Sequence, residues 1–447
     1  MICLIASGDY FSNYGGGQVY VRHLARGLMA HGDVCVVSIA IGNASQQAPQ
    51  QSYDNGLAVW QLNVDGRLVD SGKPQELQPS VLEPLQALLK QILPKLVHAH
   101  GWKAATATVC RQLGMPCVVT AHHGGIVCPN GTLLNQYDQL CQVPVSRKDC
   151  LACTLHTTPG GQIWGPVVKV LPQPLALATG RLLQRVRNIP YTSPAFKQPL
   201  AIANKQANIE VLRTCPDVMV APSHAIADAL VRNGVPANSV DVIPHGIPLA
   251  QRQPLQPGLG TRPLRLIYVG RINRGKGLHV MLQALSGLPR DAWKLHIVGA
   301  AATKAEQRYL AMLQRRYANM NANWHGDLPP KQVLQWLRHC DVMIHPAICL
   351  EVFGLTIAEA MAAGRPVIAS RCGGAEMQIT NEENGWLVPA NNAQALRQRI
   401  GKLINAPWQV QDMANRLGEV NSLAQHVTDV ASLYQRVLTR QRREAAY

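Results

Sequence analysis

The amino-acid sequence predicts an α/β protein with two parallel-sheet domains, and three observations lead to this class. Residues 341–346 (DVMIHP) form an apolar strand. Residues 351–370 (EVFGLTIAEAMAAGRPVIAS) continue through a turn, an Ala/Met-rich helix and a β-branched strand. This strand–loop–helix–strand unit is the building block of a parallel sheet. The same alternation occurs in both halves of the chain, which a proline- and glycine-rich linker at residues 254–263 separates.

Length and composition agree with this class. A chain of 447 residues accommodates two large α/β domains, although average domain size would give about three. The sequence has no uninterrupted apolar run of about 18 residues, so we expect no membrane-spanning helix. The N-terminus, MICLIASGDYF, lacks a basic leader and is typical of a buried strand rather than a signal peptide. We therefore expect a cytosolic protein.

The charge balance indicates an anionic partner. The chain has 42 Lys and Arg against 26 Asp and Glu, a formal net charge of +16. Such a balance favours nucleic acid, an anionic membrane or an acidic substrate. Aromatic residues make up only 5% of the chain, which leaves few side chains for stacking on bases. We expect an anionic membrane surface or anionic acceptor, and no nucleic acid.

The first elements combine a strand, a glycine run and a helix. Residues 1–6 predict a strand, and the helix that follows Gly15, Gly16 and Gly17 leads to a second strand at residues 33–40. A glycine-rich turn before a helix lets the backbone approach a phosphate or sugar closely. Glycine runs usually only make turns, so the pattern by itself assigns no role.

Histidines occur at two further predicted strands. His98 and His100 alternate with apolar residues in KLVHAHGW and should lie on the same side of a buried strand. We interpret His98 as a core residue and leave His100 open between the core and catalysis. The next strand, MPCVVTAHH, ends in His122 and His123. Catalytic groups of parallel sheets lie at the carboxyl ends of strands, so His122 is a candidate and the role of His123 stays open.

Four of the twelve cysteines gather in a loop-like stretch: Cys128, Cys141, Cys150 and Cys153. In a cytosolic protein, cysteines are thiols or metal ligands more often than disulfides. Four thiolates can bind zinc or an iron–sulfur cluster. The spacing fits no established zinc finger, and four reduced cysteines explain it equally well. We hypothesise that these four cysteines form a structural metal site.

The segment after these cysteines is basic. No Asp or Glu occurs from Cys150 to Ile209. The cations are Lys169, Arg181, Arg185, Arg187, Lys197 and Lys205. A helix here would have an apolar face that includes Leu175 and Leu182, a pattern typical of segments that lie on anionic membranes. We expect peripheral contact with the inner face of the plasma membrane; a solvated surface helix is the alternative.

The second half begins with a strand at residues 264–269 that ends in Gly270 and Arg271, and Lys276 precedes the next helix. Two cations and glycines at a strand–helix junction suit a diphosphate. The spacing is not that of a Walker A loop. Spacing alone would leave these cations as ordinary surface residues.

Two acids flank the helix of the central unit. Glu351 precedes its N-terminus and Glu359 lies about two turns later. The backbone N–H groups of Phe353, Gly354 and Leu355 are the unsatisfied donors at the helix start, where anions bind well. With a diphosphate between them, the two carboxylates could bind a sugar and a ribose. For the spacing alone, a capping acid and a solvated helix acid are the simpler explanation.

Together these segments closely resemble the donor-site signature of the retaining family 4 glycosyltransferases (glycosyl transferases group 1). The resemblance rests on HPAICLEVFGLTIAEAMAAGRPVIAS, CGGAEMQI, NGWLVP, the Gly-Arg…Lys-Gly loop, the Thr-x-His at residues 120–122 and the N-terminal Gly-Gly loop. It covers nearly the whole chain except about residues 127–210. Ala347 stands where the family usually has Ser, and His245 where it usually has Asn.

The resemblance implies the GT-B fold, in which two Rossmann-like domains with parallel sheets face a central cleft. It implies an acceptor-side domain at residues 1–250 with an insertion at about 127–210, a nucleotide-sugar domain at 251–425, and a last helix, 426–447, that returns to the first domain. The implied catalytic residues are His122 and Glu351. The implied donor-binding residues are Gly16, Gly17, Arg271, Lys276, Phe353, Gly354, Leu355 and Glu359.

The implied activity is retaining transfer of a sugar from a UDP, GDP or ADP sugar to an acceptor hydroxyl. No Asp-x-Asp occurs in the sequence, so we expect chemistry that needs no metal or other cofactor. Arg271, Lys276 and the helix N-terminus would meet the charge of the leaving group. The positive charge favours a bacterial envelope glycan (lipopolysaccharide, capsule or exopolysaccharide) or a lipid-linked acceptor. Two alternatives are a related-fold epimerase or phosphorylase, and a non-catalytic GT-B protein whose metal site anchors a glycan-assembly complex.

Overall fold

The computed structural model describes residues 1–11, 16–42, 48–69, 73–185 and 193–444 of the 447-residue chain. It divides into two compact units. The first consists of residues 1–136, 142–244 and 423–447, and the second of residues 137–141 and 245–422. The sequence predicts boundaries at 250/251 and 425/426. Within the described ranges, no helix is both long and apolar enough to cross a membrane.

The contact-based division differs from the predicted domains at residues 137–141. The whole insertion at about residues 127–210 was expected to belong to the N-terminal domain, but residues 137–141 group with the second unit. One contact of this segment within the second unit is an ion pair, in which the Arg274 guanidinium donates to the Asp138 carboxylate.

The described part of the first unit contains an eight-stranded sheet of order β3-β4-β2-β1-β5-β6-β7-β8. The strands are β1 (Ile2–Ser7), β2 (Val34–Gly42), β3 (Gln50–Asp54), β4 (Leu57–Asp65), β5 (Leu96–Ala99), β6 (Cys117–Thr120), β7 (Val218–Ala221) and β8 (Val240–Val242). All neighbours pair in parallel except β3 and β4, an antiparallel hairpin that the sequence analysis does not identify. The strand order reverses between β1 and β5, where ligands of open α/β sheets bind.

Helices α1 (Gly16–Leu28), α2 (Pro79–Ile92), α3 (Lys103–Leu113), α9 (His224–Arg232) and α17 (Leu423–Glu444) accompany this sheet. The last helix, α17, is part of the first unit's core. Val427, Val430 and Tyr434 are buried and share one core cluster with Leu4 of β1 and Leu24 of α1. Their spacing of three and four residues places them on one face of α17.

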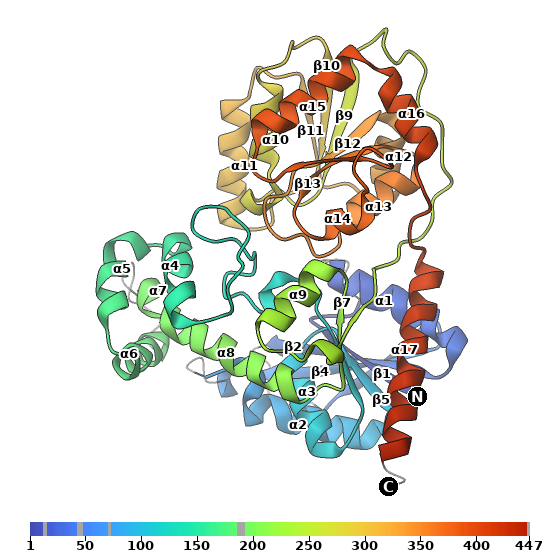
Figure 1. Ribbon diagram of the computed structural model, residues 1–447. Helices are drawn as coiled ribbons and strands as arrows, with labels where there is room; N and C mark the ends of the chain where they lie inside the picture. The colour runs from blue at the N-terminus through green and yellow to red at the C-terminus, as the bar shows by residue number, and fades with distance from the viewer. Residues whose placement is uncertain (12–15, 43–47, 70–72, 186–192, 445–447) are drawn as a thin grey trace. The chain divides into compact units, whose positions relative to one another are not determined.

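The insertion forms a helical subdomain of α4 (Arg147–Thr157), α5 (Gly161–Val170), α6 (Gln173–Arg185), α7 (Ser193–Phe196) and α8 (Gln198–Thr214). Figure 1 shows α4 to α7 grouped together, with α8 connecting them to the sheet. They surround a small core that includes Leu151, Leu155, Val168 and Ile202. The sequence analysis places Cys150 and Cys153 in a loop-like stretch, whereas the structure places both in helix α4.

The second unit contains, among its described residues, a six-stranded parallel sheet of order β11-β10-β9-β12-β13-β14. Its strands are β9 (Leu264–Val269), β10 (Trp293–Val298), β11 (Ala322–Gly326), β12 (Val342–His345), β13 (Val367–Arg371) and β14 (Trp386–Pro389). The main helices are α10 (Leu278–Leu285), α11 (Lys304–Arg316), α12 (Pro330–His339), α13 (Leu355–Ala362), α14 (Gly374–Gln378), α15 (Ala393–Asn405) and α16 (Trp408–Arg416). The strand order reverses between β9 and β12.

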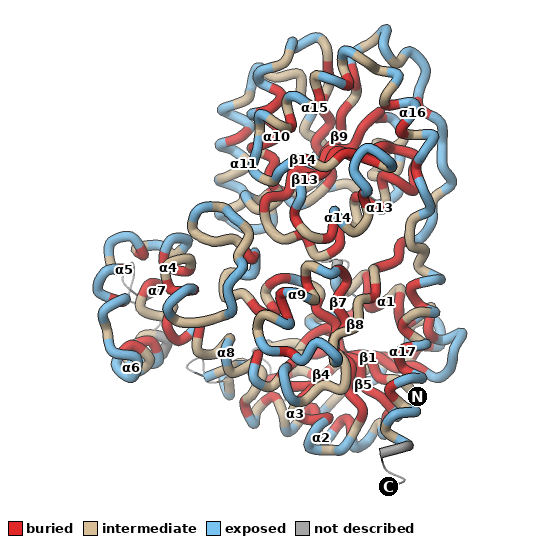
Figure 2. Tube along the Cα trace, in the orientation of Figure 1, coloured by how far each residue is buried: buried red, intermediate tan, exposed pale blue. Residues whose placement is uncertain are grey.

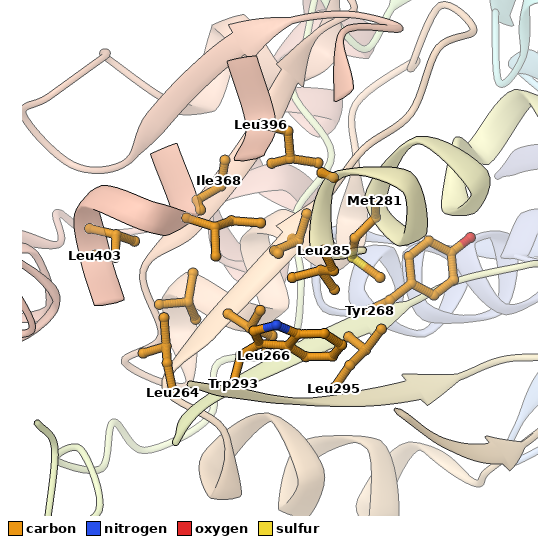
Figure 3. Packing of buried hydrophobic residues seen from close by; sticks show 14 of the residues in the cluster. Leu264, Leu266, Tyr268, Met281, Leu285, Trp293, Leu295, Ile368, Leu396 and Leu403 are labelled. Carbon is orange, nitrogen blue, oxygen red and sulfur yellow. The ribbon is translucent and has the colours of Figure 1, made fainter. Parts of the chain in front are cut away.

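Burial explains why the second sheet forms. Figure 3 shows Trp293 and Leu266 from neighbouring strands packed beneath Met281 and Leu285 of α10. Figure 2 shows the strands of both units as buried and the outer turns of the helices as exposed. The strands read as continuous apolar runs because helices cover both faces of a parallel sheet. This core fixes where the loops after β9 and β12 emerge.

Candidate active site

The loops after β9 and β12 meet at the reversal point of the second sheet. The loop after β9 passes through a short turn, η6 (Arg274–Lys276), into α10, and the loop after β12 leads to α13. A Cβ atom on Gly277 would lie 1.8 Å from the carbonyl oxygen of Pro346. The Lys-Gly pair of the sequence motif therefore lets one loop pack directly against the other.

This packing brings Lys276 to Glu351. The Lys276 Nζ lies 2.6 Å from the Glu351 Oε2, and the same oxygen is 3.0 Å from the His345 Nε2. Burial alone would raise the pKa of Glu351, but the Lys276 ammonium and the His345 hydrogen bond hold it well below its usual value. Glu351 is thus an ionised carboxylate in a buried setting, and Lys276 is its counter-charge.

Backbone contacts fix the Glu351 loop. The Glu351 N–H donates to the Cys372 carbonyl, and the Gly374 N–H donates to the Glu351 carbonyl, both at 2.7 Å. A Cβ atom on Gly374 would lie 2.5 Å from the Phe353 Cα, so glycine is required there. The Gln378 side chain donates to the Phe353 and Gly354 carbonyls. The CGGAEMQ segment therefore holds the loop that carries Glu351.

The start of α13 offers free backbone donors. Gly354 precedes the helix with a positive φ of 88°. Within the described ranges, the N–H groups of Phe353, Gly354, Leu355 and Thr356 donate to no protein acceptor. Such donors at the positive end of a helix dipole bind phosphate and other anions. Phe353, Gly354 and Leu355 thus lie where the sequence predicts the anion contact.

Glu359 lies one turn further into α13. Burial raises the pKa of its carboxyl group to about 7. Among the described residues, no side chain or backbone group forms a hydrogen bond or ion pair with this carboxylate. A half-buried acid without a protein partner beside a helix N-terminus is a typical position for a ligand contact.

Arg271 is placed differently from Lys276. Its side chain is about half exposed (52%), and its Nε lies 2.9 Å from the Glu306 Oε1. The other oxygen of Glu306 accepts hydrogen bonds from the N–H groups of Ala302 and Thr303 at 2.9 and 3.0 Å. The Glu306 carboxylate therefore lies between the Arg271 guanidinium and the N–H groups at the start of α11, where an anion is bound favourably. A phosphate would compete with it there.

The first unit presents a network of hydrogen-bonded histidines. The His100 Nδ1 and the His122 Nε2 are 2.8 Å apart, and the Tyr20 ring of α1 contacts the His122 ring edge-to-face at 4.7 Å. The Lys103 ammonium donates to the His100 carbonyl at 2.7 Å. His122 and His123 follow β6, and the His123 side chain is exposed. Gly16 and Gly17 form the first turn of α1, the helix that supplies Tyr20.

The C-terminal helix supports this network. The His426 Nδ1 is 2.7 Å from the Pro244 carbonyl, so it donates there, and its Nε2 accepts from the Tyr20 hydroxyl at 2.6 Å. His98 hydrogen-bonds to Tyr434 at 2.6 Å and Thr120 at 2.7 Å. Burial lowers the pKa of His98 to about 3, which keeps it neutral. It is a core histidine, as the sequence analysis interprets it.

The predicted metal site receives no support from the structure. Across the described residues, which include all four cysteines, no three His, Cys, Asp or Glu side chains are arranged to hold a metal ion. The reason is their placement. Cys150 is buried in the apolar core of the helical insertion, Cys153 lies on α4, and Cys141 groups with the second unit. The twelve cysteines form no disulfide.

The structure brings Lys276, Glu351, Glu359 and the start of α13 together in the second unit, and His122 and the start of α1 belong to the first. Sequence reasoning missed His345, Glu306 and Tyr20. His345 carries the signal that identified His122, because it ends a buried strand. Glu306 stands three residues after Thr303, a capping-box spacing. Tyr20 has no such signal.

Two family models match the chain. The model described as glycosyl transferase 4-like domain matches residues 15–246, and the model described as glycosyl transferases group 1 matches residues 251–421. The chain belongs to the group 1, family 4 glycosyltransferases. Together the two models cover both units of this glycosyltransferase.

Relatives of the glycosyltransferase have low sequence identity to it. It is 28% identical to WcaL of Escherichia coli K12, named for colanic acid biosynthesis, over 41% of this chain and 47% of the relative. That match spans only about half of the relative's length. The D-inositol 3-phosphate glycosyltransferase of Arthrobacter is 25% identical over 89% of this chain and 84% of the relative.

Solved structures show that the fold is GT-B. Sucrose-phosphate synthase of Thermosynechococcus elongatus superposes with a TM-score of 0.64 and 21% identity, over 99% of each chain. Anabaena HepE, solved in complex with UDP and glucose, gives a TM-score of 0.62 at 16% identity, over 97% of this chain and 99% of that one. At these identities the likeness concerns the fold alone.

Proposed function

We propose that the glycosyltransferase moves a sugar from a nucleotide-diphosphate sugar to an acceptor hydroxyl with retention of configuration. The observation that carries the proposal is the grouping of Lys276, Glu351 and Glu359 around the unsatisfied start of α13. A cation and a helix N-terminus suit a diphosphate, and carboxylates on either side suit the hydroxyls of a sugar and a ribose.

Each residue then has a task. The N–H groups at the start of α13 bind the diphosphate, Lys276 compensates its charge, and Arg271 exchanges Glu306 for a phosphate oxygen. Glu359 accepts hydrogen bonds from the ribose, and Glu351 from the sugar. His122, oriented by His100 and Tyr20, binds the sugar near the reaction centre, and Gly16 and Gly17 allow the close approach of the α1 backbone.

The chemical step needs one bond exchange. The bond between the anomeric carbon and the phosphate oxygen breaks, and a bond from the acceptor oxygen forms on the same face of the sugar. The acceptor proton passes to the departing phosphate oxygen. Positive groups already aimed at that oxygen stabilise its developing charge. Because Lys276, Arg271 and the helix start supply this charge, we propose that the reaction requires no metal or other cofactor.

We propose an anionic envelope glycan, such as lipopolysaccharide, capsule or exopolysaccharide, or a lipid-linked glycan as the acceptor. The names of WcaL and of the lipopolysaccharide galactosyltransferase WaaB, which shares the fold, point to envelope glycans. Two lysines near His122 also support an anionic acceptor. Lys103 donates to the His100 carbonyl, and Lys205 of α8 donates to the Gly125 carbonyl. Burial lowers the pKa of Lys103 to about 8, so the ammonium is still mostly charged at neutral pH.

Thermal stabilisation by nucleotides tests the donor site. A ligand that binds only the native state raises Tm with its occupancy. We expect UDP, GDP or ADP and the matching nucleotide sugar to stabilise the wild type, and Glu359→Ala and Arg271→Ala to lose that effect. Glu382→Ala, at an exposed acid elsewhere in the second unit, is the control. Stabilisation that survives both site variants would show that the nucleotide binds elsewhere.

The non-catalytic alternative makes a different prediction. A working transferase hydrolyses its donor slowly without an acceptor, whereas an anchoring protein does not. The anchoring proposal also requires a metal site, which the described residues do not form. Release of free sugar from the stabilising nucleotide sugar therefore separates the two functions.

A further inference from the structure

The outward faces of α5 and α6 expose large apolar side chains. Ile163, Val167 and Val170 of α5 are 75%, 44% and 79% exposed, and Leu175 and Leu182 of α6 are 52% and 64% exposed. The α5 residues are spaced by four and three positions and the α6 residues by seven, so each set lies on one helical face. We name this set the α5–α6 surface and propose that it docks the glycosyltransferase onto an anionic lipid membrane.

The insertion's own packing does not require these side chains. The opposite side of α5 supplies Val168 and Trp164 to the small core with Leu151, Leu155 and Ile202. Helix α5 therefore has apolar residues both on its buried side and on an exposed side. An exposed apolar patch marks a protein or membrane interaction site. One side of α5 is buried within the insertion, and Figure 2 shows exposed turns on α5 and α6.

The polar residues around the α5–α6 surface select the kind of partner. The exposed residues from 162 to 182 are Gln162, Ile163, Pro166, Val167, Lys169, Val170, Pro172, Gln173, Pro174, Leu175, Ala178, Arg181 and Leu182. Apart from two glutamines and two cations, all are apolar. No acid occurs from residue 150 to 209. The sequence analysis also counts Arg185 and Arg187 among the cations of this basic segment. The Arg185 side chain and residue 187 lie outside the described part of the chain.

An anionic bilayer fits this combination better than a second copy of the chain. A two-fold dimer would bring the cations of one copy against those of the other, because the same patch lies on both sides of the interface. Anionic headgroups instead attract Lys169 and Arg181. The apolar side chains between them would enter the boundary between headgroups and acyl chains, as in amphipathic interfacial helices.

Membrane docking adds to the proposed function without depending on donor chemistry. It would hold the enzyme at the surface where lipid-linked or envelope acceptors are built. Because the test measures binding alone, its failure would leave the transferase proposal standing, and a failed donor assay would leave the docking proposal standing.

Co-sedimentation with vesicles tests the proposal with the full chain. We expect the wild type to sediment with phosphatidylglycerol/phosphatidylcholine vesicles and to stay in solution with phosphatidylcholine alone. Ile163→Glu/Val170→Glu should weaken binding at least about tenfold, because it removes two exposed apolar anchors and adds negative charge. Lys169→Gln/Arg181→Gln should also weaken it and reduce its dependence on salt.

A matched control adds the same charge elsewhere. Val231 of α9 and Met312 of α11 are apolar and 40% and 44% exposed. Val231→Glu/Met312→Glu should bind vesicles like the wild type, and all variants should keep the wild-type Tm. The proposal is overturned if the wild type does not bind anionic vesicles or if control and test variants lose binding equally. Concentration-dependent dimerisation that Ile163→Glu/Val170→Glu abolishes, without vesicle binding, would assign the surface to a second copy.

Discussion

The two units place a histidine at the carboxyl end of a strand in opposite ways. His345 of the second unit hydrogen-bonds to Glu351, which carries the Lys276 ion pair. His122 of the first unit hydrogen-bonds to His100 and contacts an aromatic ring. One site is organised by compensated charges and the other by a hydrogen bond between two histidines and an aromatic contact. The difference matches the two proposed tasks, since binding a diphosphate needs charge and binding a sugar needs orientation.

Among the variants that test this comparison, Lys276→Met should have the largest effect on stability and on donor binding. It leaves the Glu351 carboxylate buried without its counter-charge, so we expect the free energy of unfolding to fall by about 3 kcal/mol and donor binding to be lost. Urea unfolding and nucleotide-dependent Tm measure the two effects. Adding Glu351→Gln should restore much of the stability but not the binding, because it removes the unpaired charge.

The exposed ion pair between Arg213 and Glu210 is the control for this cycle. Its atoms are 2.8 Å apart, but its side chains are 43% and 64% exposed. Arg213→Met should change the free energy of unfolding by less than about 1 kcal/mol. If Lys276→Met costs no more than Arg213→Met, charge compensation does not organise the second site.

His100 and His98 allow the histidine network to be tested within one strand region. His100→Phe removes the partner that orients His122, so we expect donor hydrolysis to slow about tenfold or more while the donor KM stays within about twofold. His100→Asn, which can still hydrogen-bond, should recover part of the rate. Tm should change little in either variant.

His98→Phe should show the opposite behaviour. It leaves the hydroxyl groups of Thr120 and Tyr434 without their partner, which costs about 1–3 kcal/mol of stability. Its hydrolysis rate per folded molecule should stay near that of the wild type. Equal effects of His98→Phe and His100→Phe on rate would mean that the network supports only the fold.

Glu359 gives the smallest expected effect, a pH dependence. Its pKa is raised to about 7, so the carboxylate that we propose to accept hydrogen bonds from a ribose forms as pH rises. Between about pH 6 and 8, nucleotide affinity should increase up to about tenfold in the wild type. Glu359→Gln should bind the nucleotide weakly, and its affinity should change less with pH. Because the nucleotide itself titrates in both experiments, the difference between the two proteins reports Glu359. A matching rise in the variant would assign the pH dependence to the nucleotide.

The same shift has a consequence for stability with the opposite sign. The pKa of Glu359 in the folded state lies above its unfolded value of about 4.3, so the folded state holds the proton more tightly. The resulting contribution to the free energy of unfolding is fully present below that pH and is lost as pH rises towards about 7. Glu359→Gln should therefore gain stability relative to the wild type near pH 7. Urea unfolding at two pH values measures this change.

The donor half was predictable because its signals are local. The acids Glu351 and Glu359, the turn between them and the start of α13 lie in one short stretch, and helix geometry alone relates them. The hairpin of β3 and β4 also had a local signal, the Asn55-Gly56 dipeptide, which the sequence analysis left unused. The helix α4 was missed because its cysteines dominated the interpretation of that segment.

The first unit was less predictable because its contacts join distant segments. The Tyr20 hydroxyl meets His426, 406 residues later, and no spacing rule relates the two. The same holds for His98 and Tyr434. The apolar face with Leu175 and Leu182 on α6 was predicted, but the exposed apolar residues of α5 were not, because only the small insertion core shows which side of α5 is left exposed.

The position of α17 also governs how the chain is made. Its buried stripe completes the core of the first unit, yet it follows the entire second unit in the chain. Domains usually fold from the N-terminus as they are synthesised. Here α17 is translated only after the entire second unit, so the apolar surface of the first unit that α17 covers is open to chaperones and to aggregation until then.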